Sequence, residues 1–109
     1  MNTVQQHQLA ELLLEIEMEM RRMTLWEREP PPHEALASTM PFCHDLLEFH
    51  QWLQWILLPR LATLIEQDMP LPSGSDIHPM AEYCFAELDQ DLTRLLTLIG
   101  QVDEVLNRE

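Results

Sequence analysis

The chain has 109 residues, of which 46% are hydrophobic and only two are glycine. It carries 19 acidic residues against six arginines and no lysine, which gives a formal net charge of −13 at pH 7. Such a charge disfavours direct binding to nucleic acids and to anionic membrane surfaces, since both present phosphate groups. Scarce glycine and frequent Leu, Glu, Gln and Met favour helices, so we expect a single all-α domain over residues 1–109.

Two features of the sequence bear on the cellular location of the protein: its N-terminal stretch and its cysteines. The N-terminal stretch MNTVQQHQLAE has neither the basic region nor the apolar region of a signal peptide. Cys43 and Cys84 are too few to staple a domain that can bury a core of its own. We therefore expect a cytoplasmic protein in which both thiols are free.

The first predicted helix starts at Thr3, whose spacing from Gln6 fits a capping box. After Trp26, the sequence EREPPPHEALAS, residues 27–38, contains three consecutive prolines that end the helix. We expect these residues to form a loop packed against its own domain, with a proline-rich ligand for an outside domain as the alternative. The apolar stripe of this helix, at steps of four and three, is Leu9, Leu13, Ile16, Met20 and Met23.

The second predicted helix starts near Thr39, with Pro41 in its first turn. Pro59 would cost about 3 kcal/mol inside a straight helix, so we expect a kink or a break just before it. A further helical piece then runs to about Gln67. The apolar stripe before the proline consists of Phe42, Leu46, Phe49, Leu53 and Ile56.

The last part of the chain predicts a loop followed by helix. Residues 68–76 carry two prolines and a glycine and predict the loop, after which Pro79 suits the first turn of a helix. Apolar steps continue to the end of the chain, but Asp89 and Asp91 favour a new helix start, so we expect a break at 88–90. The whole pattern predicts an antiparallel bundle of four to five helices with a proline kink near its centre.

The stretch FHQWLQWILLPRL, residues 49–61, is the most apolar part of the chain. On a helical wheel, Phe42 falls on the core side, whereas Trp52 and Trp55 form a second strip that flanks the core. This strip needs a cover. Either Trp26 with the prolines that follow it, or a binding partner, supplies that cover.

Arg60 is the unusual residue of this stretch. An unbroken helix would place Arg60 inside the core stripe, where a charge must be paired or must escape, and a kink at Pro59 offers the escape. Two interpretations stay open: an arginine that pins a carboxylate or free carbonyl groups, and one that binds an anion or a peptide carboxylate beside an aromatic groove. The candidate binding residues are Trp26, Phe42, Trp52, Trp55, Pro59 and Arg60.

Motifs of the common enzyme and metal-site classes are absent from the sequence. It has no lysine for Schiff-base chemistry, no G-x-S-x-G elbow, no Gly-rich phosphate loop, and no CxxC or HExxH pattern. His44 and Glu48 share a helix face, with His33 and His78 in loops, but surface histidines explain this pattern better than a metal site. Glu48, Arg60 and other polar residues interrupt the apolar run well before the length of a membrane span. We expect no catalytic residue, cofactor, metal or membrane segment.

The block WLQWILLPRL, residues 52–61, resembles the YqcC-like family of small bacterial proteins. The resemblance extends over most of the chain and includes Trp26 before the acidic proline loop, residues 39–42 (TMPF), the pair Leu71-Pro72, and Pro79 at a helix start. The matching positions within the block are Trp52, Leu53, Gln54, Trp55, Pro59 and Arg60.

The resemblance implies a small all-α bundle without an established activity. Because members of the family are often encoded beside a tRNA pseudouridine synthase, it also implies an accessory role in tRNA modification. Some relatives carry a proline near position 90, where this chain has Gln90, so the resemblance does not decide the break before the last helix.

Three functional hypotheses follow from the sequence. The first is a binding module that presents a surface of tryptophan, proline and arginine to a protein partner, with an RNA-modifying enzyme as the candidate. In this hypothesis the acidic helices help the chain to approach a basic partner. The second is a purely structural strip, or a homodimer formed through it. The third is a small-ligand or metal-binding protein.

Overall fold

The computed structural model describes residues 3–43 and 45–108, and in this part of the chain it contains helices and no strand. This confirms the predicted all-α class. Two short irregular helices, the 3-10 helix η1 (Pro41–Cys43) and the π-helical segment η2 (Leu53–Leu57), accompany the α-helices. The α-helices are α1 (Thr3–Arg22), α2 (His33–Leu36), α3 (Phe49–Trp52), α4 (Leu58–Glu66), α5 (Ile77–Phe85) and α6 (Thr93–Leu106).

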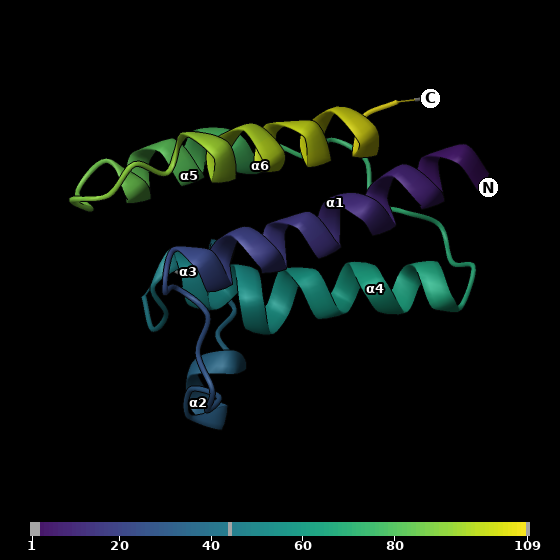
Figure 1. Ribbon diagram of the computed structural model, residues 1–109. Helices are drawn as coiled ribbons and strands as arrows, with labels where there is room; N and C mark the ends of the chain where they lie inside the picture. The colour runs from purple at the N-terminus through teal and green to yellow at the C-terminus, as the bar shows by residue number, and fades with distance from the viewer. Residues whose placement is uncertain (1–2, 44, 109) are drawn as a thin grey trace.

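The long helices form an antiparallel bundle in which α1 lies between two neighbours (Figure 1). One side of α1 packs against α6, and α6 in turn packs against α5. The other side of α1 packs against α4, which continues from α3 and η2. The chain reverses direction between successive long helices, so its two ends lie at the same end of the bundle, whereas α2 projects from the opposite end (Figure 1).

The core forms along the apolar stripe that the sequence predicts for the first helix. Leu9, Ile16 and Met20 are fully buried, and Met23 packs against the core at the end of α1. The facing helices contribute the other large side chains that are fully buried, because each carries apolar residues at helical spacing. These side chains are Leu53, Leu61, Leu95, Ile99 and Val102.

The region between the first proline loop and residue 49 differs from the prediction. The loop contains the single helical turn α2, and the second helix begins at Phe49 and not near Thr39. Phe42 and Cys43 have φ angles of 57° and 50°, a left-handed conformation that a continuous right-handed helix does not accommodate. The expected core position of Leu46 is therefore wrong, and this side chain is 54% exposed.

The start at Phe49 has a local cause that sequence reasoning missed. The Glu48 side chain and the side chain of Gln51 form a reciprocal capping box, in which the Glu48 backbone N–H donates to Gln51 Oε1 at 2.8 Å. Such a box satisfies the free N–H groups of a first helical turn. Leu47, the residue before the cap, is buried in place of its neighbour Leu46.

The sequence predicts a kink or a break just before Pro59, and the structure has a π-helical segment, η2, there and no break. There the backbone N–H of Leu58 donates to the carbonyl of Leu53, five residues back instead of four. Trp52, Leu53, Leu57 and Leu58 all keep right-handed helical angles, so α3, η2 and α4 follow one another without a break. Pro59 has no N–H to donate to the carbonyl four residues before it. The π turn shifts the hydrogen-bonding pattern next to this position, so the helix continues past the proline.

The π turn also explains the position of Arg60. It holds one residue more than an α turn, so the residues after it are rotated by about 100° relative to an unbroken α-helix. This rotation places Leu61 in the core, where it is 1% exposed, and turns Arg60 to the surface. No ion pair or hydrogen bond joins Arg60 to another residue that the structure describes, so it does not pin a carboxylate at the junction.

The last part of the chain follows the prediction. The segment between α4 and α5 is a loop, and α5 ends at Phe85, well before α6 begins at Thr93. Asp91 lies just before the N-cap residue Leu92, and its Oδ1 accepts hydrogen bonds from the N–H and the hydroxyl of Thr93 at 3.1 and 2.7 Å. The same hydrogen bonds hold the pKa of Asp91 below its usual value.

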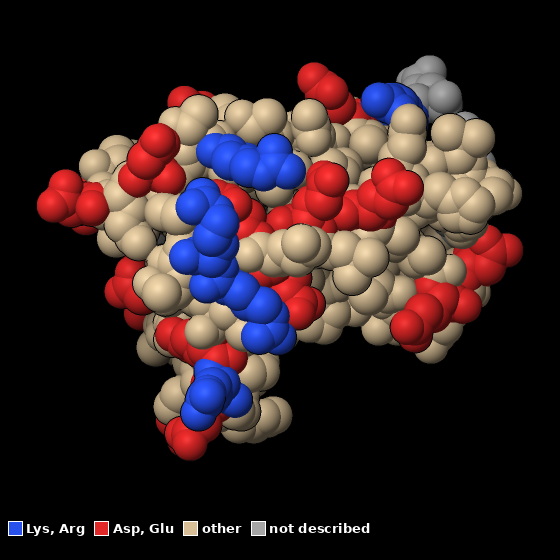
Figure 2. Space-filling model, in the orientation of Figure 1, with Lys and Arg blue, Asp and Glu red and all other residues tan. Residues whose placement is uncertain are grey.

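Charge is unevenly distributed over the surface. Acidic groups are spread widely, but basic groups form a row on the face shown in Figure 2, from α6 across the end of α1 toward α2. Arg22 and Arg94 both lie close enough to Glu19 to influence its carboxylate, and Arg21 and Arg28 line a common pocket. We call these four residues, Arg94, Arg22, Arg21 and Arg28, the arginine row.

None of the described helices combines the length and the apolar character that crossing a bilayer requires.

Candidate functional site

A groove between α1 and α4 is the most developed concave surface that sequence-predicted site residues line. It has a volume of about 640 Å³ and is closed at one end by the segment 26–28, which follows α1. We call it the tryptophan groove. Its lining consists of Leu13, Leu14, Glu17, Arg21, Trp26, Glu27, Arg28, Gln54, Trp55, Leu58, Pro59 and Ala62.

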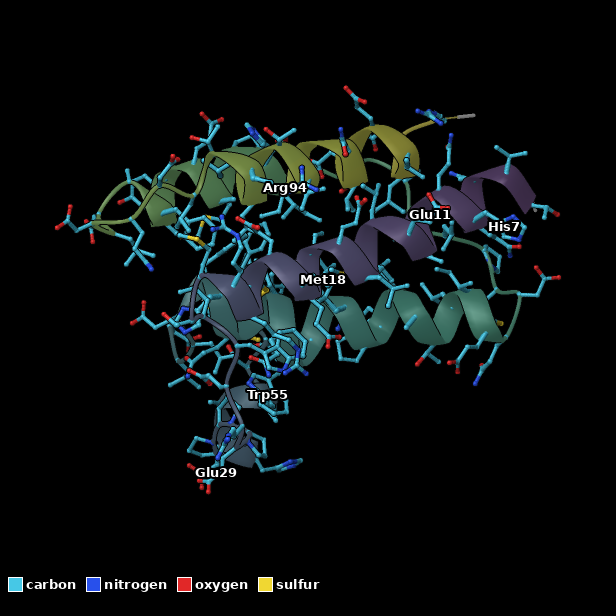
Figure 3. All side chains as sticks on the ribbon, viewed as in Figure 1. His7, Glu11, Met18, Glu29, Trp55 and Arg94 are labelled. Carbon is cyan, nitrogen blue, oxygen red and sulfur yellow. The ribbon has the colours of Figure 1, made fainter. Side chains whose placement is uncertain are left out.

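The groove is apolar inside and charged at its rim. Buried Leu13 from α1 and Leu58 from α4 contribute to its floor, and the half-buried rings of Trp26 and Trp55 form its walls. Leu14 on the rim is 64% exposed. In Figure 3, the labelled Met18 of α1, which is 69% exposed, and Trp55 lie on the same side of the molecule. This side therefore offers an apolar surface that the chain leaves partly uncovered.

A buried amide holds the closing segment in place. Gln54 is only 4% exposed, and both ends of its side chain bind the backbone of Glu27. Its Nε2 donates to the Glu27 carbonyl at 2.7 Å, and its Oε1 accepts from the Glu27 N–H at 2.8 Å. Because both amide groups are satisfied by one residue, the position of Glu27 along η2 is closely defined.

The carboxylate of Glu27 turns toward the helix and not into solvent. Gln51 Nε2 donates to it at 3.2 and 3.3 Å, and Trp55 Nε1 donates at 3.4 Å. A ring nitrogen of His50 lies 3.3 Å from the same carboxylate. These contacts orient the indole of Trp55, whose nitrogen faces Glu27 while the ring contributes to the groove.

The second tryptophan is fixed by a stacked arginine. The guanidinium of Arg21 lies 4.9 Å from the ring centre of Trp26, which is cation–π distance, and also pairs with Glu17 at 2.9 Å. Trp26 lies four residues after the end of α1 at Arg22, beyond a turn in which Thr24 has a φ angle of 59°. The two tryptophans thus come from separate segments and are each held by a polar contact.

The structure brings together three of the six predicted binding residues. Trp26, Trp55 and Pro59 line the tryptophan groove. The other three lie elsewhere: Arg60 is exposed on α4 outside the groove lining, and Phe42 and Trp52 belong to an aromatic cluster with Phe49 and Phe85.

The helical wheel predicts that Trp52 and Trp55 form one strip, but only Trp52 belongs to the aromatic cluster. Trp52 is 8% exposed, and the ring of Phe42 packs edge-on against it with a centroid distance of 4.8 Å. Trp55 is covered instead by Glu27, and only in part. None of the prolines 30–32, which the sequence offers as part of the cover, lines the groove.

Sequence reasoning did not propose the other nine residues of the groove lining, and three of them illustrate why. Gln54 carried a signal, because an amide inside an apolar helical run must find a partner when the helix is buried. Leu14 also carried a weak signal, since it lies off the stripe of the first helix. Nothing in the sequence indicated that Arg28 would line the groove, because only the fold places its loop beside α4.

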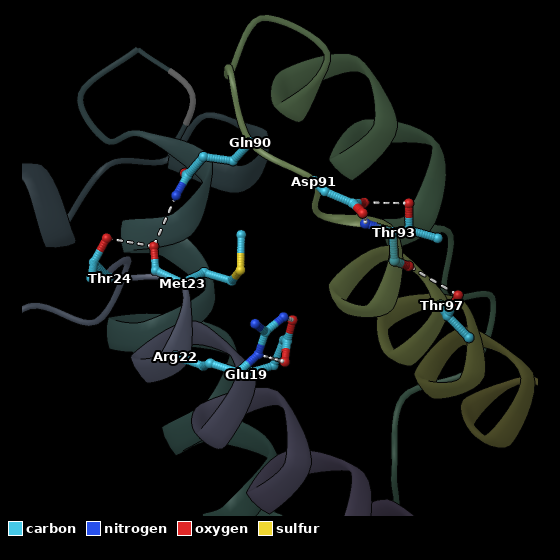
Figure 4. Close-up of polar contacts among 8 residues, drawn as sticks. All are labelled: Glu19, Arg22, Met23, Thr24, Gln90, Asp91, Thr93 and Thr97. Atoms are coloured by element: carbon cyan, nitrogen blue, oxygen red, sulfur yellow. Dashed lines mark hydrogen bonds and ion pairs between the residues drawn. The ribbon is translucent and has the colours of Figure 1, made fainter.

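A second group of polar contacts fixes the C-terminal end of α1 (Figure 4). Glu19 is 5% exposed, and its carboxylate accepts hydrogen bonds from Arg22 Nε at 2.9 Å and Nη2 at 2.7 Å. Gln90, from the loop between α5 and α6, donates to the carbonyl of Met23 at 3.0 Å. The hydrogen bonds from Arg22 hold the pKa of Glu19 below its usual value.

This lowered pKa predicts a pH-dependent contribution to stability. The pair with Arg22 contributes fully above about pH 5, and the contribution disappears as the pH falls through the lowered pKa of the folded state. Glu19→Gln therefore reduces the free energy of unfolding near neutral pH, and its difference from the wild type shrinks on acidification. Denaturant unfolding at a series of pH values, followed by circular dichroism, measures this difference.

The matched control for this prediction is Glu15→Gln. Glu15 is an exposed acid of the same helix, and its substitution removes the same charge without removing a buried ion pair. A difference between wild type and Glu19→Gln that stays constant from neutral to acid pH contradicts the prediction.

The described residues contain no group of three or more His, Cys, Asp and Glu side chains arranged to hold a metal ion. His44, which the sequence pairs with Glu48, lies outside the described residues. Cys43 is buried and Cys84 half-buried, and both are free thiols, as the sequence predicts. Burial raises the pKa of the Cys84 thiol, and the nearby carboxylates of Glu48 and Glu87 add to this effect.

Comparison with known proteins identifies relatives of this chain. An uncharacterized protein of Haemophilus influenzae is 33% identical over 101 residues, which cover 93% of this chain and 94% of that protein. The uncharacterized protein YqcC of Escherichia coli K12 is 37% identical over 88 residues, 81% of each chain. The solution structure of Escherichia coli YqcC matches the fold with a TM-score of 0.82 at 26% identity, covering 94% of this chain and 87% of that one.

A relative of a different kind is named tRNA pseudouridine synthase C and comes from Pectobacterium carotovorum. It is 37% identical over 67 residues, which cover 62% of this chain but only 18% of that protein. Residues 8–105 match the protein family DUF446, whose description is also tRNA pseudouridine synthase C. The chain therefore belongs to the DUF446 family, together with the small YqcC proteins.

Proposed function

We propose that this chain is a protein-binding module, not itself an enzyme, whose tryptophan groove docks a tRNA pseudouridine synthase in the cytoplasm. The observation that carries the proposal is the partly uncovered apolar surface formed by Trp26, Trp55 and Leu14 beside a buried floor. A contiguous exposed apolar patch is the usual mark of a protein–protein contact. Tryptophan side chains are also the residues that most often dominate the energy of such contacts.

The choice of partner rests on the comparisons. The segment shared with the Pectobacterium protein makes up 18% of that protein, so we assign the activity in its name to the remaining length. A module joined to an enzyme in one chain is a natural partner of that enzyme where the two are separate chains. This assignment gives the present chain an accessory role and leaves the chemistry to the synthase.

The experiment titrates this chain against purified tRNA pseudouridine synthase C in a calorimeter. Trp55→Ala is expected to weaken binding by roughly 30-fold, the effect of losing a hot-spot side chain. Leu14→Gln, which removes apolar surface from the exposed rim and keeps good helix propensity, is expected to weaken binding to a smaller extent. Thermal melts establish that both variants remain folded.

Tyr83→Ala is the matched control, because Tyr83 is an aromatic side chain on α5 that is 73% exposed and lies outside the groove. Equal affinities for Trp55→Ala and Tyr83→Ala would overturn the proposal, as would the lack of any binding by the wild type. Sedimentation of the chain alone tests the homodimer: a dimer that Trp55→Ala dissociates would make the groove a contact between two copies.

A further inference from the structure

We infer that the part of the partner that enters the tryptophan groove is an acidic segment with apolar side chains. This inference rests on the proposed function and names the chemistry of the same contact. The acidic surface as a whole predicts a basic partner, but the groove lies beside the arginine row, which holds four of the six basic residues of the chain. The groove lining itself contains two arginines, Arg21 and Arg28, and two glutamates, Glu17 and Glu27, so its charge is balanced although the chain as a whole is strongly acidic.

The carboxylates paired with the row are better sheltered than its guanidinium groups. Side-chain exposure is 65% for Arg22 but 5% for its partner Glu19. It is 57% for Arg21 but 38% for Glu17. Glu27 is 32% exposed and is hydrogen bonded toward the helix. The guanidinium groups of Arg21 and Arg22 are therefore more accessible to an approaching molecule than the carboxylates with which they pair, and Figure 2 shows blue groups at the surface on this face, the lowest of them separated from the others by acidic atoms.

Two members of the row remain available for a ligand. No ion pair joins Arg28 or Arg94 to another residue that the structure describes. Arg28 lines the groove. Arg94 lies in the first turn of α6, outside the groove lining. A guanidinium group binds a carboxylate through two parallel hydrogen bonds, so the row suits carboxylates next to a segment whose apolar side chains fill the groove.

Phosphates are the other anions that arginines recognise. The chain has 19 acidic residues, so a nucleic acid strand that extends beyond the row would meet carboxylates that repel each further phosphate. A short acidic segment contacts the row alone, and charges more than about 8 Å away are screened at physiological salt. The charge distribution therefore favours a protein segment over RNA.

The test compares charge reversals in the titration with tRNA pseudouridine synthase C. The double variant Arg28→Glu, Arg94→Glu is expected to weaken binding by roughly tenfold or more, because two cations become repulsive toward carboxylates. Arg108→Glu is the matched control, since Arg108 is an exposed arginine after α6, outside the row and outside the groove. It is expected to bind with the affinity of the wild type.

Three outcomes would overturn the inference. One is a double variant that binds more tightly, which means that the segment is basic. Another is a double variant that behaves like Arg108→Glu. The third is saturable binding of fluorescent tRNA to the wild type that the double variant loses, which makes the row an RNA site. If Trp55→Ala weakens binding and the double variant does not, this inference fails alone; if Trp55→Ala has no effect, the proposed function fails.

Discussion

Asp103→Ala is expected to lower the free energy of unfolding by about 3 kcal/mol, because each of three lost hydrogen bonds contributes about 1 kcal/mol. Asp103 lies in α6 but serves the start of α5. Its Oδ1 accepts from the Ser75 hydroxyl at 2.6 Å and from the Ile77 N–H at 2.9 Å, and its Oδ2 accepts from the His78 N–H at 2.8 Å. Urea unfolding followed by circular dichroism measures the loss.

The expected loss is large because α5 has no cap of its own. Asp76, the residue before α5, makes no capping hydrogen bond, so the first N–H groups of the helix depend on Asp103. The charge of Asp103 also interacts favourably with the positive end of the helix dipole. Glu104→Ala removes a neighbouring exposed acid and should change stability by no more than about 0.5 kcal/mol. Equal losses in the two variants would contradict this account.

The fold was predictable where the pattern of neighbouring residues decides the structure. The stripe of the first helix places Leu9, Ile16 and Met20 in the core, and the structure buries all three. The break before the last helix was also predictable, because Asp89 and Asp91 favour a new helix start, and α6 begins shortly after them at Thr93. In these segments, local propensity and tertiary packing favour the same conformation.

Prediction failed where packing overrides the local pattern. The apolar steps of residues 42–49 fit a helix, but Phe42 takes a left-handed φ angle, and its ring packs against Trp52. Burial of an aromatic side chain provides enough free energy to offset such a local cost. The candidate site divides in the same way: Trp26 and Trp55 line one groove, whereas the π turn carries Arg60 to the surface outside it.

Gln54→Leu is expected to lower the free energy of unfolding by about 2 kcal/mol, since the N–H and the carbonyl of Glu27 each lose a partner worth about 1 kcal/mol. Leucine has nearly the volume of glutamine, so the change removes hydrogen bonds more than packing. It also releases the segment that closes the groove. The emission of Trp26 and Trp55 should therefore shift to longer wavelength, because both rings gain contact with water.

Gln101→Leu is the matched control, because Gln101 is an exposed glutamine in the middle of α6. It should leave the emission unchanged and the free energy of unfolding within about 0.5 kcal/mol of the wild type. If Gln54→Leu matches this control, the amide does not hold the closing segment. If it shifts the emission and also weakens binding of the synthase, the position of segment 26–28 determines the shape of the site. The polar residue inside WLQW would then act on the groove through Glu27, without lying at the exposed surface itself.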